Sequence, residues 1–410
     1  MKNLKLIAST ILIGMSLSAC GGGSESSPQP STPVTPSKPD PKPTPNPKPD
    51  DSNPKPDVTP KPDVTPKPEP ETKPDPTPLT AEEKRLGLQI NNDLSLRRSE
   101  CGFGGLSYNE DLTSIAQTHT QYLKHINTSV KSPIYNPHLQ VALVGIENLT
   151  GESNPYYIGD TAADRVQTTP YATAKYGAFE NIATRTQTGD TALAADLDET
   201  AAFMLSSLLA APYHAKALLD RRMVDSGTGF GVYTPYGADP KRSRGHILVT
   251  NGGVAPSIKP NPKVRAGVLT YPCNNQEGLA QALYNESPNP FGDTRDLAKN
   301  PIGQPIYVVD SAATKVEVTN VTFTDIDRNI DVPVKILDSS NDPHKDTGSA
   351  MKDNEAFIMP LTDSFKTCRG FRVGNCGLYE LTNHSVSFDL ITDGKLERRT
   401  VKFKTGKFSG

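Results

Sequence analysis

The feature that most constrains this chain is a proline-rich segment at residues 21–78, which holds 20 of the 38 prolines in the sequence. Its only other apolar side chains are Val34, Val58 and Val64, so the segment cannot bury a hydrophobic core. Prolines at this density remove backbone donors and favour extended polyproline II. We therefore predict a disordered spacer, or tether, over residues 20–78. A ligand for an aromatic-lined groove is the alternative, which the interspersed lysines and acidic residues disfavour.

The start of the chain has the layout of an export signal. Two lysines precede twelve mostly apolar residues, 6–17, which are too few to span a bilayer as a mature helix. The segment ends Leu17-Ser18-Ala19-Cys20, which resembles the lipobox of bacterial lipoproteins. This resemblance implies a signal peptide over residues 1–19 and acyl chains on Cys20 that anchor the protein in a membrane. The alternative is a soluble secreted protein in which Cys20 is unmodified.

Two further features bear on location and partners. Gly21, in place of Asp, resembles the address of outer-membrane lipoproteins, which face either the periplasm or the cell surface. The formal net charge of -3 and the pI near 6.2 leave no basic surface for a polyanion. We therefore expect no nucleic acid as a partner.

Residues 79–255 contain helix patterns followed by strand patterns. Helices are expected over residues 80–97, after a capping box at Thr80, and from Asn109, with His119 on the apolar face. Others start at Thr161 and Asp198, and Pro212 is expected to end the latter. Two alternating runs, 229–233 and 246–250, predict a β-hairpin. The pattern indicates an α+β domain.

Five motifs then occur in order across about 130 residues. They are Gly105-Leu106-Ser107-Tyr108-Asn109, Ser153-Asn154-Pro155-Tyr156-Tyr157-Ile158-Gly159, Phe179-Glu180-Asn181-Ile182-Ala183, Tyr213-His214 and Gly227-Thr228-Gly229-Phe230-Gly231. Together they resemble the CAP superfamily (SCP or pathogenesis-related-1-like), in particular its bacterial extracellular branch. The resemblance implies an α-β-α sandwich with a cleft lined by Glu and His.

Carried over residue by residue, the resemblance assigns Glu180 and His214 to the cleft and predicts that they lie within a few ångströms of each other. The family's first cleft His falls at Ile146-Glu147 here, so Glu147 borders the cleft and Ile146 forms an apolar wall. His119 supplies an imidazole from the second helix, or His138 does if the alignment slips.

The chemistry of these residues leaves several alternatives. A His beside a Glu supplies an oriented general base, but the sequence has no nucleophile elbow, no His-Glu-x-x-His and no P-loop. His119, Glu180 and His214 are a weak candidate set for Zn²⁺, although a His on an apolar helix face is more often a core residue. We assign no catalytic residue and no cofactor. Glu180 has a structural alternative in which it pins a loop.

Residues 262–410 change to strand periodicity. Alternating runs such as 332–336 and 386–390, separated by turn signals, predict a β-sandwich with a bulge or bend near Asn320. The module resembles the Ig-like domains that follow bacterial CAP domains. No motif in it carries chemistry, so a spacer or a binding module is expected.

Four cysteines besides Cys20 allow three pairings in an exported chain. Cys368 and Cys376 are eight residues apart across glycines and suit a local bridge. Cys101 and Cys273 would then join the first helix to the second domain.

These observations favour an exported, lipid-anchored protein of the cell envelope, with a non-enzymatic CAP domain. Its partners would be the membrane, reached through the anchor, and a small molecule, lipid or wall component. The alternatives are a hydrolase, such as a peptidase or wall hydrolase, that uses His214 and Glu180, and a structural adhesin.

Overall fold

The computed structural model describes the backbone of residues 14–20, and residues 78–171, 177–189, 196–254, 261–368 and 374–407. Residues 21–77 of the predicted tether and residues 1–13 of the predicted signal peptide lie outside these residues. The described residues from 78 onward belong to one compact unit. They form an α+β fold in which three sheets and five α-helices are described. Among the helices in the described ranges, none is long and apolar enough to cross a membrane.

The first sheet has the strand order β1-β3-β5-β4-β2. Its strands are β1 (Gly14–Cys20), β2 (Ser107–Tyr108), β3 (Gly177–Thr188), β4 (Met223–Tyr233) and β5 (Ser243–Val254). The pairs β3 with β5 and β5 with β4 are antiparallel, which confirms the predicted hairpin. β1 pairs with β3, and all of it except Cys20 lies in the segment that the sequence predicts to be removed on export.

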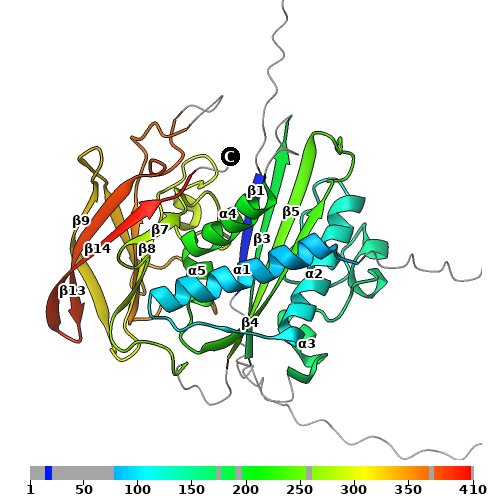
Figure 1. Ribbon diagram of the computed structural model, residues 1–410, viewed down its shortest axis with the longest axis horizontal. Helices are drawn as coiled ribbons and strands as arrows, with labels where there is room; N and C mark the ends of the chain where they lie inside the picture. The colour runs from blue at the N-terminus through cyan, green and yellow to red at the C-terminus, as the bar shows by residue number, and fades with distance from the viewer. Residues whose placement is uncertain are drawn as a thin grey trace, which may run out of the picture. The chain divides into compact units, whose positions relative to one another are not determined.

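Helices cover both faces of this sheet (Figure 1). Gly227 and Gly229 of β4 allow α2 (Glu110–Ser129) to approach, since a Cβ on either would meet the α2 backbone at 2.1 to 2.4 Å. The opposite face of β4 meets α1 (Ala81–Glu100), where a Cβ on Gly87 would lie 2.8 Å from the Thr228 carbonyl oxygen. The remaining helices are α3 (Ala162–Gln167), α4 (Leu197–Ala210), α5 (Pro212–Leu218) and the short 3-10 turns η1 (Glu147–Leu149) and η2 (Gly151–Ser153).

The helix starts follow the local sequence signals. The capping boxes at Thr80 and Thr161 are both formed, and the Asn109 side chain accepts from the Leu112 amide. α4 begins at Leu197, one residue before the predicted start at Asp198. Its N-cap is Asp196. Pro212 does not only follow α4 but is the first residue of α5, a position that needs no amide donor.

The carboxy-terminal part contains two sheets. One has the order β10-β9-β13-β14-β7 and the other β11-β12-β8-β6. A register shift pairs Ser387 with Thr322 but Asp389 with Thr319, so the bulge predicted near Asn320 is confirmed. The strands are β6 (Leu269–Tyr271), β7 (Gln276–Leu279), β8 (Ile306–Val309), β9 (Val316–Asp325), β10 (Ile330–Asp331), β11 (Val334–Asp338), β12 (Glu355–Pro360), β13 (Asn383–Thr392) and β14 (Lys395–Thr405), with a 3-10 turn η4 (Gly292–Thr294).

The two predicted domains, 79–255 and 262–410, share one hydrophobic core. Phe103, after α1, stacks on Tyr307 of β8 with ring centroids 6.2 Å apart. Lys216 of α5 forms an ion pair of 2.6 Å with Glu355 of β12, and both side chains are largely buried. The first sheet and the two carboxy-terminal sheets are therefore held together by core packing and by buried polar contacts.

Candidate functional site

Glu180, the predicted cleft carboxylate, lies on β3 and is 2% exposed. Its two oxygens each accept a hydrogen bond of 2.7 Å from Nη2 of Arg165, which is fully buried at the end of α3. Arg165 also donates to the His138 carbonyl at 3.1 Å. The carboxylate is therefore neutralised by a guanidinium, a partner that the sequence analysis did not assign to it.

Two histidines complete the surroundings of Glu180. Nδ1 of His138 lies 2.9 Å from Oε1 of Glu180, so the imidazole beside the carboxylate comes from the loop after α2. Nε2 of His119 lies farther away, at 3.9 Å, and is 2.8 Å from the Pro137 carbonyl oxygen. Nδ1 of His119 lies 2.6 Å from the Gln140 amide nitrogen. We call His119, His138, Gln140, Arg165 and Glu180 the Glu180 cluster.

The electrostatics of the Glu180 cluster follow from its burial. Burial pushes the pKa of Glu180 upward, but Arg165 and the two histidines hold it well below its usual value. Burial lowers the pKa of His119 to about 3, so this imidazole is neutral at physiological pH. The cluster is thus a carboxylate fixed by a cation, and its bonds hold the loop of His138 and α3 against β3.

His214, the other predicted cleft residue, is bonded to a different carboxylate. It lies in α5, and its Nδ1 is 3.1 Å from Oε1 of Glu286 in the carboxy-terminal part. The same oxygen accepts hydrogen bonds from the amides of Tyr213 at 2.7 Å and His214 at 3.1 Å. Within the described residues no hydrogen bond or ion pair joins His214 to Glu180. Glu180 is therefore bonded to Arg165 and His138, and His214 is bonded to Glu286.

The other predicted site residues can be placed as well. Glu147 is exposed at the start of η1, and backbone amides near it lower its pKa. Ile146 packs against a small core cluster that contains Ala116 and Tyr122. In the described part of the chain, no group of three or more His, Cys, Asp or Glu side chains could hold a metal ion. The proposed set of His119, Glu180 and His214 therefore does not converge, because His214 points to Glu286.

Both predicted disulfides are formed. Cys101 is bonded to Cys273 and Cys368 to Cys376. The first bridge links Cys101, at the end of α1, to Cys273, two residues after β6. It therefore joins the two predicted domains, as expected. Disulfides of this kind are typical of proteins exported to an oxidising compartment.

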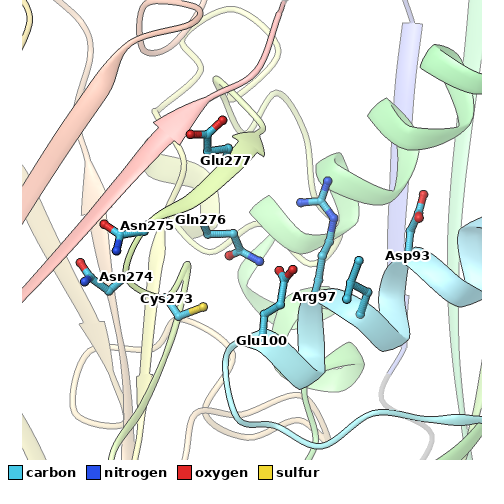
Figure 2. A pocket seen from close by; sticks show the side chains of 9 residues that line it. Asp93, Arg97, Glu100, Cys273, Asn274, Asn275, Gln276 and Glu277 are labelled. Carbon is cyan, nitrogen blue, oxygen red and sulfur yellow. The ribbon is translucent and has the colours of Figure 1, made fainter.

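A pocket of about 530 Å³ lies beside the Cys101–Cys273 bridge (Figure 2). Its walls come from one face of the carboxy-terminal half of α1 and from residues 273–277, which lead into β7. Sequence reasoning missed this pocket. Its signal was present, since Asp93, Arg97 and Glu100 recur at helical spacing and an Asn-Asn-Gln-Glu run follows Cys273.

Comparisons with known proteins add no assignment: no protein-family model, no curated protein and no solved structure matches this chain. Function must therefore be argued from its own residues.

Proposed function

We propose that the chain is an exported, lipid-anchored protein of the cell envelope, with a CAP-type domain and an Ig-like module, that binds a small polar ligand without catalysing a reaction. Cys20 would carry the lipid, and residues 21–78 would hold the folded part away from the membrane, either in the periplasm or at the cell surface. The lipobox-like tetrapeptide and the two disulfides support export.

The observation that carries the non-enzymatic proposal is the bonding of Glu180. A general base must reach a substrate proton and accept it near neutral pH. Glu180 is buried, bound on both oxygens by Arg165, and has a pKa held well below its usual value. His214, the other residue of the hydrolase alternative, is buried against Glu286. These contacts favour a structural role for both residues.

The binding role is supported by the pocket beside α1. It is lined by polar and charged side chains from both folded parts, which the disulfide and the shared core hold in place. Pockets of roughly 300–1,000 Å³ are typical ligand sites, and this one has a volume of about 530 Å³.

The anchoring step can be tested in a bacterial host fed a labelled fatty acid. Wild-type chain should incorporate label and partition into detergent, whereas Cys20→Ser should do neither, because two or three acyl chains anchor a protein far more firmly than none. Ser24→Ala in the same segment is the matched control and should behave as wild type. Equal labelling of wild type and Cys20→Ser would refute the lipid anchor.

The binding step can be tested by native mass spectrometry of the full chain released from micelles. A co-purifying small molecule would support the binder. Hydrolysis of peptide or wall substrates that is abolished by Glu180→Gln would instead establish the hydrolase alternative.

A further inference from the structure

The pocket beside the Cys101–Cys273 bridge carries an excess of negative charge. Asp93, Arg97 and Glu100 line it from α1, and Glu277 lines it from β7. The lining thus contains three carboxylates and one guanidinium, which gives a formal local charge of about -2. Since no set of carboxylates in the described residues converges on a metal position, a cation held here would be an extended organic one.

Two charged side chains of this pocket, Arg97 and Asp93, make few hydrogen bonds within the described residues. Arg97 has five N–H donors, but within the described residues it makes one hydrogen bond, of 3.4 Å, to the Tyr271 hydroxyl. Asp93 is half-buried and, among those residues, accepts no hydrogen bond, and burial raises the pKa of its carboxyl despite the nearby Arg97. Acceptors and donors that are withdrawn from water without partners are costly, so the pocket gains from a ligand that satisfies both.

A buried amide gives an independent indication of a ligand. Gln276 is 6% exposed, and its Nε2 atom has no hydrogen-bond partner in the part of the chain that the structure describes. In Figure 2 its side chain points from β7 toward Glu100 and Arg97 of α1. An acceptor in the pocket, such as a ligand carboxylate, would pair with this amide and with Arg97.

The spacing of the charged side chains along α1 limits how the groups of a ligand can be arranged. Arg97 lies between two carboxylates, about 6 Å along the helix axis from Asp93 and about 4.5 Å from Glu100. Leu96 also lines the pocket and is 57% exposed, so it offers an apolar surface to methylene groups. Aromatic side chains, on which sugar rings commonly stack, are not among the residues lining this pocket.

We propose that this pocket binds a small basic zwitterion of the lysine type, whose carboxylate pairs with Arg97 and Gln276 and whose ammonium groups pair with Asp93 and Glu100. The aliphatic chain of the ligand lies over Leu96. This inference rests on the proposed function, in which the folded part binds a small polar ligand, and it names the chemical class of that ligand.

The test is isothermal titration calorimetry of the full mature chain in micelles, at low ionic strength, with three probes. L-lysine has all the proposed groups, cadaverine lacks the carboxylate and L-norleucine lacks the second ammonium group. We expect L-lysine to bind at least tenfold more tightly than either of the others. Equal affinity for all three probes, or no binding of L-lysine at millimolar concentration, would overturn the proposal.

Variants then assign the groups. Asp93→Asn and Glu100→Gln should each weaken L-lysine binding about tenfold, because a charged hydrogen bond is lost, and Arg97→Lys should weaken L-lysine more than cadaverine. Asp346→Asn, an exposed carboxylate of the carboxy-terminal part, is the matched control and should bind as wild type. An unfolding midpoint measured for each variant separates lost binding from lost folding. Equal weakening by Asp346→Asn and Asp93→Asn would show that only the net charge matters and would refute the site.

A short peptide that ends in lysine could present the same groups, so Gly-Lys and free L-lysine form the two arms that distinguish a peptide end from a free amino acid. The anchoring result is independent of both. Lipidation of Cys20 without L-lysine binding would refute this pocket alone, whereas L-lysine binding without lipidation would refute the anchor and leave the pocket standing.

Discussion

Two buried carboxylates, Glu180 and Glu286, are held in contrasting ways. Glu180 is paired with Arg165, a permanent cation, inside the first folded part. Glu286 faces His214 and two backbone amides across the junction between the two parts. Burial raises the pKa of Glu286, and His214 with the amides offsets only part of that rise. The pKa of Glu180 moves the opposite way, because Arg165 and the histidines outweigh its burial.

This difference shows what each carboxylate contributes. The Glu180 cluster fixes a loop and a helix onto β3 through a charge that persists over the physiological pH range. Glu286 caps the start of α5, and a second contact, from the Tyr213 hydroxyl to Asp342 at 2.5 Å, reinforces the same junction. One region therefore depends on a local ion pair and the other on the docking of the two parts.

The largest effect is expected from breaking the ion pair. Arg165→Met leaves the buried Glu180 carboxylate without its cation, and the loss should be about 3–5 kcal/mol in the free energy of unfolding. Denaturant titration measures it. Adding Glu180→Gln to this variant removes the stranded charge and should recover most of the loss.

Arg85→Met is the matched control for this prediction. Arg85 pairs with Glu82 and Asp198 on the surface, where water screens the charges, so its removal should cost far less than removal of Arg165. Equal losses for the two Arg variants would show that burial of the Glu180 pair does not set its strength.

The next effect concerns the junction. Replacing Cys101 and Cys273 together by Ser removes a disulfide whose cysteines are 172 residues apart in the sequence. The free energy of unfolding should fall by about 2–4 kcal/mol, because the unfolded chain is no longer constrained by this crosslink. Replacing Cys368 and Cys376, which are 8 residues apart, should cost less because the closed loop is short.

Hydrogen exchange locates the consequence of that change. The amides of Tyr213 and His214, which donate to Glu286 across the junction, should lose more protection in the Cys101/Cys273 variant than the amide of Gln140, which donates to Asp160 within the first part. Uniform loss of protection at all three amides would indicate that the two regions unfold as one unit.

Whether a contact could be predicted from the sequence depends on how far apart its residues lie in the chain. The capping box at Thr80, the helix start at Thr161 and the bulge near Asn320 were predicted correctly, because each depends on residues close in the chain. The disulfides were predicted because four cysteines allow few pairings.

The partners of the two carboxylates were not predicted. Nothing in the local sequence marks Arg165 as the cation for Glu180, because α3 reaches β3 only in the folded chain. Glu286 lies 72 residues after His214, in the other predicted domain. His214 and Glu286 meet only because the two predicted domains dock against each other, so the contact cannot be predicted from either domain alone.

The smallest effect is a pair of opposite pH profiles. The folded pKa of Glu286 is raised above its ordinary value of 4.5, so its contribution to stability is complete below about pH 4.5 and is lost as pH rises through the folded pKa. The folded pKa of Glu180 is lowered, so its contribution is present above about pH 4.5 and is lost as pH falls below it.

The free energy of unfolding of wild type, Glu286→Gln and Glu180→Gln should be measured by denaturant titration between about pH 3 and pH 8. The wild type's advantage over Glu286→Gln should shrink as pH rises above about 4.5, and its advantage over Glu180→Gln should shrink as pH falls below that value. For a single proton, either slope is at most about 1.4 kcal/mol per pH unit. Slopes of the same sign would contradict the contrast between the two carboxylates, because a permanent cation and a desolvated junction shift a carboxyl pKa in opposite directions.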